Sequence, residues 1–215
     1  MLQSLPGRSH RYCSELMSAP RYTQPTKTTR PRGSRLIETY SPKLGRRVSF
    51  YSRAAFELWL GLEADPAIRT FCERPEILTV DGRERVIDMW VQSASGDHFV
   101  AYTGDTRLPA EWNGLPVRRI VDADLAATRM WASNWERMLP VITLTRDCVS
   151  RQHLADVRRH IRESMSLMRV ERELGSEDPM WLRGAVFRLL ATGILLAPML
   201  RTERLSLMTA FEPAP

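Results

Sequence analysis

The chain has 215 residues, of which 43% are hydrophobic, and it carries a formal net charge of +6 at pH 7. This length exceeds that of a typical domain, so we expect two small domains with ordinary cores. The longest apolar run, residues 189–200, is interrupted by Gly193 and Pro198 and is too short to span a bilayer. Three widely spaced cysteines without a C-x-x-C pair indicate reduced thiols in a cytoplasmic protein.

The basic residues are concentrated at the N-terminal end. Residues 1–47 hold ten Lys or Arg against Glu15 and Glu38, a net charge of +8 that leaves −2 for the remainder. Prolines among Ser, Thr and Arg, without an apolar period, predict a disordered tail over residues 1–34. Two roles fit this composition. One is salt-sensitive binding to nucleic-acid phosphate, and the other is a leader that keeps the chain in solution.

A helix is predicted over residues 52–66, with Ser52 as its N-cap and a proline at its end. Apolar residues recur along one face at i, i+3 and i+4, namely Phe56, Trp59 and Leu60. Glu57 lies beside this apolar stripe.

Three strands are predicted after this helix. Mostly apolar runs at 76–80 and 86–91 flank a turn at 81–82, and a third run, 98–104, follows a turn near Ser95. Asp88 lies within the second run. The expected order is therefore helix, strand, strand, strand.

The motifs of this segment resemble the N-terminal domain of TnsA-like proteins, the endonuclease subunits of heteromeric (Tn-type) transposases. In chain order they are Arg-x-x-Phe-Glu at 53–57, Leu-Glu-Ala-Asp-Pro at 62–66, Phe-Cys-Glu-Arg-Pro at 71–75, and a Gly-to-Asp step at 82–88. The resemblance covers roughly residues 35–121. It implies an α/β fold with a restriction-endonuclease-like mixed sheet.

The resemblance also implies a metal site. In such nucleases a helix glutamate and a strand aspartate hold Mg²⁺, and an acid-x-lysine motif on the third strand completes the site. Carried over, the metal ligands are Glu57 and Asp88. A hairpin that turns around Ser95 puts Asp88 opposite Tyr102, so that Tyr102 and Gly104 occupy the acid and lysine positions. Neither residue can do that chemistry, so we expect either an altered Mg²⁺-dependent endonuclease or a catalytically degenerate derivative.

Asp105 and Arg107 offer a shifted acid-x-base pair for the catalytic site. Arginine is a poor replacement for lysine because its guanidinium stays protonated and is a fixed fork. Asp105 would also lie at or beyond the end of the third strand. Taken singly, Glu57 is more often a solvated helix residue and Asp88 a turn or cap residue.

The basic residues near the start of the nuclease-like domain are the predicted nucleic-acid contacts: Arg35, Arg46, Arg47 and Arg53. A strand over 116–121 and a helix from Asp122 to about Leu139 are expected to complete this domain, which spans residues 35–140. Residues 140–147 have the composition of a connection.

The C-terminal domain, residues 148–215, is predicted to be a small, mostly helical winged helix. A charged helix begins at Ser150, and a shorter helical stretch ends near residue 175. Asp178 and Gly193 are the expected N-cap and C-cap of a third helix. Residues 194–199 and 205–211 can pair as a terminal hairpin.

Two functions follow from these patterns. Residues 187–196 resemble the end of TnsA-like chains, whose C-terminal winged domain serves mainly protein assembly. The predicted third helix carries only Arg183 and Arg188, a thin basic face for reading duplex DNA. The resemblance therefore implies a subunit acting at transposon DNA ends with an integrase-fold transposase and an ATPase regulator. The alternative is a winged-helix transcription regulator without nuclease ancestry, which would bind duplex DNA without a metal.

Overall fold

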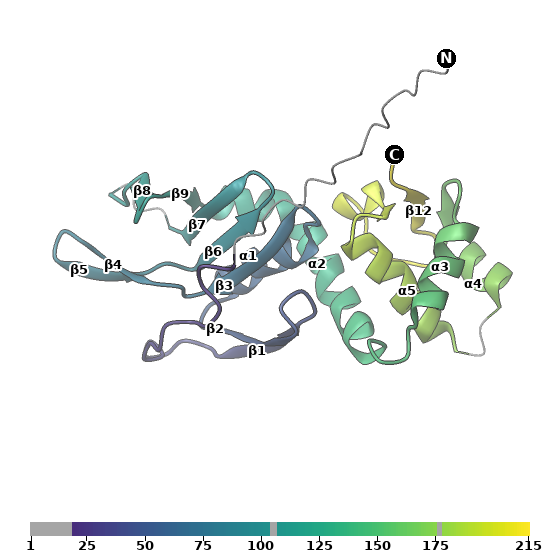
Figure 1. Ribbon diagram of the computed structural model, residues 1–215, viewed down its shortest axis with the longest axis horizontal. Helices are drawn as coiled ribbons and strands as arrows, with labels where there is room; N and C mark the ends of the chain where they lie inside the picture. The colour runs from purple at the N-terminus through teal and green to yellow at the C-terminus, as the bar shows by residue number, and fades with distance from the viewer. Residues whose placement is uncertain (1–18, 104–106, 176–177) are drawn as a thin grey trace, which may run out of the picture.

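The structure, a computed structural model, describes residues 19–103, 107–175 and 178–215. A sheet-containing unit and a mostly helical unit lie along the long axis of the molecule, and helix α2 (Asp122–Leu144) runs from one to the other (Figure 1). The chain is therefore an α/β protein. In the described residues, no helix is both long and apolar enough to cross a membrane.

The first unit is built on a mixed five-stranded sheet. Its strands, in order across the sheet, are β3 (Ile68–Glu73), β6 (Met89–Ser93), β7 (Gly96–Tyr102), β9 (Leu115–Ile120) and β8 (Glu111–Trp112). Strands β3, β6 and β7 form an antiparallel meander, whereas β7 and β9 are parallel. A parallel pair needs a crossover connection. Here the described part of that crossover, residues 107–114, contains β8 and no helix.

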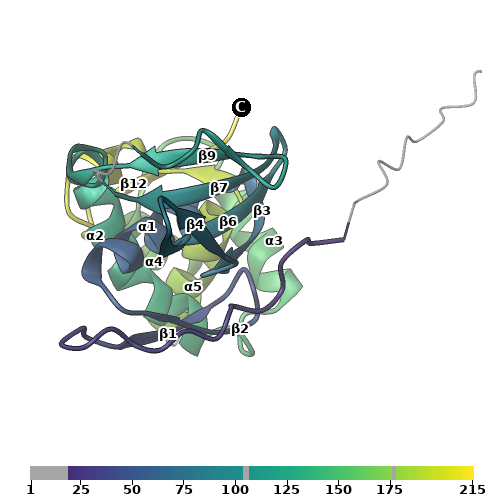
Figure 2. The same cartoon turned by 90° about the vertical axis from the view of Figure 1, so that its left-hand side faces the viewer.

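The predicted hairpin around Ser95 is confirmed, because β6 pairs with β7. Strands β4 (Ile77–Val80) and β5 (Arg83–Val86) pair with each other as a separate ribbon, with Asp81 and Gly82 at positive φ in the turn. On its other side β6 pairs with β3, which was not predicted as a strand. The apolar run 86–91 is split at residues 87–88, because its two halves belong to different sheets. A further hairpin, β1 (Ile37–Ser41) with β2 (Arg46–Phe50), lies below the main sheet in Figure 2.

Helix α1 (Arg53–Ala64) covers one face of the sheet together with α2. As predicted, the Ser52 side chain caps it by accepting a hydrogen bond from the Ala55 amide, at 3.1 Å. The Lys43 ammonium closes the other end by donating to the Leu62 and Asp65 carbonyls, at 2.8 and 2.7 Å. These carbonyls have no partner within the helix, so the lysine satisfies them.

The N-terminal segment covers the opposite face of the sheet. The Tyr22 ring packs against Trp90 and Phe99, with ring centroids 5.5 and 5.7 Å apart. The Thr26 amide donates to the Arg74 carbonyl at 2.8 Å. The prediction of disorder over residues 1–34 was therefore wrong for residues 22–26, because an aromatic side chain anchors them. Residues 1–18 lie outside the described residues.

Helix α2 is longer than predicted. It continues past Leu139 and through Pro140 to Leu144, so most of the expected connection at 140–147 is helical. Proline removes one hydrogen bond from a helix interior. Tight packing on both sides of the proline compensates, because Trp135, Met138 and Ile142 are all buried.

The second unit contains three helices and a small antiparallel sheet. Its elements are α3 (Arg151–His160), β10 (Met165–Ser166), α4 (Leu167–Leu174), α5 (Pro179–Ala191), β11 (Leu195–Leu196), the 3₁₀ helix η1 (Pro198–Arg201) and β12 (Ala210–Pro213). The sheet order is β10, β12, β11. The predicted cap Asp178 is confirmed, and Ser150, expected to begin the charged helix, is the N-cap of α3. The predicted terminal hairpin is shorter than expected, with Leu195 opposite Pro213.

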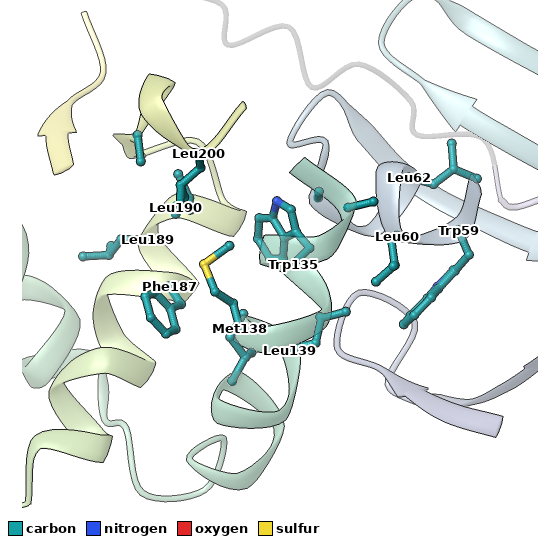
Figure 3. Packing of buried hydrophobic residues seen from close by; sticks show 14 of the residues in the cluster. Trp59, Leu60, Leu62, Trp135, Met138, Leu139, Phe187, Leu189, Leu190 and Leu200 are labelled. Carbon is teal, nitrogen blue, oxygen red and sulfur yellow. The ribbon is translucent and has the colours of Figure 1, made fainter. Parts of the chain in front are cut away.

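One hydrophobic core runs through both units. Figure 3 shows Trp135, Met138 and Leu139 of α2 between residues of α1 and residues of α5 and η1. Asn134, which is 0% exposed, fixes the loop around η1. Its amide nitrogen donates to the Leu200 and Glu203 carbonyls at 2.8 and 2.7 Å, and its oxygen accepts from the Leu205 amide at 2.8 Å. The boundary predicted between residues 140 and 148 therefore falls inside a shared core.

Candidate functional site

One predicted metal ligand, Asp88, contacts Tyr102 at one end of the main sheet. The Tyr102 amide donates to Asp88 Oδ2 at 2.7 Å, and its hydroxyl donates to Asp122 Oδ1. The hydrogen bond to Asp122 raises the pKa of the Tyr102 hydroxyl, and the charges of Asp122, Glu57 and Asp88 raise it further. Asp88 and Asp122 thus contact this tyrosine directly, whereas Glu57 acts on it only through its charge.

Asp88 directly precedes β6, and its pairing differs from the prediction by one residue. Met89 pairs with Val100, so the same register places Ala101, not Tyr102, opposite Asp88. The side chain nevertheless reaches the Tyr102 amide. Burial raises the pKa of the Asp88 carboxyl to about 6, although hydrogen bonds to backbone amides oppose this shift. The ionised carboxylate is therefore poorly compensated, and a nearby cation would stabilise it.

Glu57 already has a cation beside it. Arg53 Nε donates to Glu57 Oε1 at 2.8 Å, and the two terminal nitrogens of Arg53 donate to Glu136 at 2.9 and 2.6 Å. These hydrogen bonds, first to Glu136 and then to Glu57, raise the pKa of Arg53 above its usual range. Arg53 was predicted to contact nucleic acid, whereas the structure places it between two carboxylates of the protein itself.

The described residues alone do not complete a cutting site of the expected kind. Across the described residues, no group of three or more His, Cys, Asp or Glu side chains is arranged to hold a metal ion. Glu57 and Asp88 supply the oxygen ligands that Mg²⁺ prefers, but Asp122 is hydrogen-bonded to Tyr102. The sequence contains only two lysines, Lys27 and Lys43, and the second caps α1. Lys43 is therefore not placed to orient a nucleophile.

Of the shifted acid-x-base pair, only Arg107 lies among the described residues. Asp105, like Gly104, lies outside the described residues. The Arg107 guanidinium lies 3.8 Å from Asp81 Oδ2 at the turn of the β4–β5 ribbon. This ribbon projects from the sheet in Figure 1, and Asp88 follows its opposite end. The structure thus gives Arg107 a contact at the ribbon turn, and a catalytic role for Asp105 and Arg107 stays a prediction.

The other predicted nucleic-acid contacts divide into two kinds. Arg35 and Arg47 are exposed. Arg46 makes a two-pronged ion pair with Glu73, at 2.8 and 2.6 Å, and Glu73 is only 2% exposed. Removing that guanidinium from Glu73 would leave a buried carboxylate unpaired, so Arg46 has a structural role that its sequence context does not reveal.

Sequence reasoning missed Asp122 and Glu136 as members of this site. Asp122 was expected only as the start of a helix. Its place follows from the parallel pairing of β7 with β9, in which Tyr102 lies opposite Ile120, two residues before Asp122. A correct prediction of that strand pair would have brought Asp122 to the site. Nothing in the local pattern links Glu136 to Arg53.

The DNA-reading surface expected of the second unit is occupied by the protein itself. Arg183 of α5 pairs with Glu171 at 2.6 Å, and Arg188 donates to the Val149 carbonyl at 3.0 Å. A Cβ atom on Gly184 would lie 2.1 Å from Thr145 Oγ1, which shows how closely α5 approaches the end of α2. The loop around η1 is held by Asn134. Both α5 and this loop therefore face α2.

Comparison of the chain with models of known protein families gave no match, and comparison with curated proteins gave no significant match either. A proposal of function therefore rests on the geometry of the residues around Tyr102 and of the surfaces of the second unit.

Proposed function

We propose that the chain is a TnsA-like subunit of a heteromeric transposase, which positions transposon DNA ends and assembles with its partners but has lost independent cutting. The carrying observation is that Asp88 accepts a hydrogen bond from the Tyr102 amide at one end of the sheet, while the charge of Glu57, 31 positions earlier, acts on the same tyrosine. The proposed partners are an integrase-fold transposase and an ATPase regulator.

The order of elements supports the nuclease lineage. A helix that carries a glutamate precedes an antiparallel meander, an aspartate stands at the start of its middle strand, and a strand parallel to the third strand follows. This is the arrangement that the restriction-endonuclease-like expectation requires. The crossover from β7 to β9 departs from the pattern, because its described residues form no helix.

The chemistry of the site supports the loss of cutting. Arg53 pairs with Glu57, Ala101 lies opposite Asp88 where an acid was expected, and Lys43 is engaged at the end of α1. A metal-dependent nuclease needs a complete ligand set, together with a group that orients the attacking water. Mg²⁺-dependent hydrolysis by this chain alone would therefore require groups from Asp105, Arg107 or a partner.

The second unit supports an assembly role. Three helices with a β10–β12–β11 sheet have the order of a winged helix, in which α5 would be the DNA-reading helix. Here α5 packs against α2 and its arginines bind Glu171 and Val149. A helix in this position cannot enter a major groove without leaving the shared core. This disfavours the alternative of a winged-helix transcription regulator.

The test is a cleavage and binding assay with plasmid and end-containing duplex DNA in Mg²⁺ or Mn²⁺, with and without the partner transposase. We expect end binding or transposase association and no cleavage by the chain alone. Asp88→Ala is compared with Glu84→Ala, an exposed acid on β5. Cleavage that is lost in Asp88→Ala and kept in Glu84→Ala would establish a working site. A chain that binds neither the DNA ends nor the transposase would contradict the TnsA-like lineage itself.

A further inference from the structure

We propose that a groove on the second unit binds an acidic, aliphatic peptide segment of a partner protein. This arginine groove is lined by Arg158, Ile161, Arg162, Ile194, Leu195 and residues 213–215. The inference does not depend on nuclease ancestry, since it concerns only the surface between α3 and the β11–β12 pair.

The groove has the size and lining of a peptide site. It encloses about 500 Å³ between the end of α3 and the last residues of the small sheet. Ile161 and Leu195 are each only 1% exposed and form an apolar floor, while Ile194 and Pro213 contribute to the walls. The floor itself is already buried, so the apolar surface that an aliphatic side chain would remove from water is that of the half-buried Ile194 and the exposed Pro213.

The two arginines of the groove form no ion pair within the described residues, unlike nearby arginines of the same unit. Within the described part of the chain, the Arg158 guanidinium has no hydrogen-bond or ion-pair partner, and that of Arg162 has one, the Arg159 carbonyl at 2.9 Å. By contrast, Arg159 is paired with Asp156, and Arg169 with Glu173. No acidic side chain lines the groove. Its positive charge is therefore available to a carboxylate from outside.

The position of the groove leaves it accessible. Helix α5 lies between α2 and α3 in Figure 1, so α3 is on the side of this unit that faces away from α2. Arg158 and Arg162 are both exposed. Because α5 and the loop around η1 are already packed on α2, α3 and the adjacent strands offer the free surface to a partner.

A peptide fits this groove better than a nucleic-acid backbone does. A phosphodiester could accept hydrogen bonds from the arginines, but it would leave the apolar surface of Ile194 and Pro213 exposed to water. An aspartate or glutamate next to an aliphatic residue meets both needs, because arginine binds carboxylates through paired hydrogen bonds. The charge and the apolar lining together therefore select an acidic, aliphatic segment.

The experiment selects peptides from a phage-displayed random library on the immobilised full chain and measures them by fluorescence anisotropy. We expect the selected peptides to place Asp or Glu beside aliphatic residues. Replacing those acids by Asn or Gln should weaken binding about tenfold or more, and Arg158→Gln with Arg162→Gln should do the same. Arg151→Gln, on the first turn of the same helix and outside the groove, is the matched control and should leave the affinity unchanged.

Other results would overturn the proposal. These are no enrichment of acidic peptides, or binding that the double substitution does not weaken in a protein with unchanged thermal unfolding. Stronger binding of a short DNA duplex that depends on Arg158 and Arg162 would identify a nucleic-acid contact instead. Because no cleavage or end-binding step enters the measurement, its failure is distinct from failure of the proposed function.

Discussion

Gly184 of α5 lies so close to Thr145, at the end of α2, that a Cβ atom on the glycine would be 2.1 Å from Thr145 Oγ1 and 2.9 Å from its Cβ. No real Cβ atom tolerates such a contact, so glycine at this position sets the distance between the two helices. The contact is one of the features that join the two units.

The first prediction is that Gly184→Ala lowers the free energy of unfolding by about 2 kcal/mol, because overpacking costs typically 1–3 kcal/mol. Alanine is otherwise favoured over glycine within a helix by about 1 kcal/mol. Gly61→Ala is the matched control, since a Cβ on this α1 glycine meets nothing within 4 Å. We expect it to be neutral or stabilising in urea denaturation. Equal effects of the two substitutions would refute the close approach.

The second prediction concerns the buried amide of Asn134. Asn134→Ala removes three hydrogen bonds and leaves two carbonyls and one amide of the loop around η1 unsatisfied. A buried unsatisfied group costs about 1–3 kcal/mol, so we expect a loss of roughly 3 kcal/mol in unfolding free energy. Gln152→Ala, which removes an exposed hydrogen bond on α3, should change stability by less than about 0.5 kcal/mol. Protease sensitivity that rises at residues 197–209 would locate the effect.

The third prediction uses the raised pKa of Asp88. In the folded chain the Asp88 carboxyl has a pKa of about 6, whereas its ordinary value is 3.8. The proton contributes stability that is fully present below about pH 4 and is lost as the pH rises through 6. Asp88→Asn keeps the oxygen that accepts from Tyr102 and removes this titration. We therefore expect the variant to be more stable than wild type at pH 7, by at most about 3 kcal/mol at 1.36 kcal/mol per pKa unit.

This prediction also bears on metal binding. The check is chemical denaturation from pH 4 to 8, with and without Mg²⁺, and Asp81→Asn serves as the control because its side chain is 65% exposed. If Mg²⁺ stabilises wild type at pH 7 but not Asp88→Asn, then Asp88 does hold a cation, and the view that the ligand set is incomplete has to be revised.

The fourth prediction concerns Tyr22, whose hydroxyl donates to Glu76. Burial raises the pKa of Tyr22 to about 12, and the neighbouring Glu76 adds to this. Stability from this group is present below about pH 10, its ordinary pKa, and is lost as the pH rises toward 12. Tyr22→Phe should lose about 1 kcal/mol at pH 7 and show a weaker decline above pH 10. Tyr51→Phe is the control at neutral pH, and an equal loss there would contradict a special role of the Tyr22 hydroxyl.

Local features of the fold were predictable from sequence. The caps Ser52 and Asp178 were identified correctly, because capping depends on residues within a few positions of each other. Pro140 was misleading, because the burial of its neighbours along α2 outweighs the local cost of a proline. The pairing of β6 with β7 was predicted from the turn near Ser95, but its pairing with β3 was missed because a short apolar run does not show which strand lies on its other side.

The residues of the candidate site also divide into those that the sequence predicted and those that it did not. Glu57 and Asp88 were identified by resemblance to a family pattern, and the structure gives a direct contact with Tyr102 for Asp88 alone, while Glu57 acts on that tyrosine through its charge. Asp122 and Glu136 were missed, because they reach the site through a parallel strand pair and through an ion pair that spans 83 positions. Contacts of this kind follow only from the assembled fold.

The continuity of α2 has a mechanical consequence. Its 23 residues extend for about 35 Å, at 1.5 Å for each residue. The first turn carries Asp122, which binds Tyr102, and the last turn leads into Thr145 beneath Gly184. A tilt of about 5° in a rod of this length moves its far end by about 3 Å. If α2 tilts as a rigid rod when a partner pulls on the second unit, the Asp122 side chain at its other end is displaced.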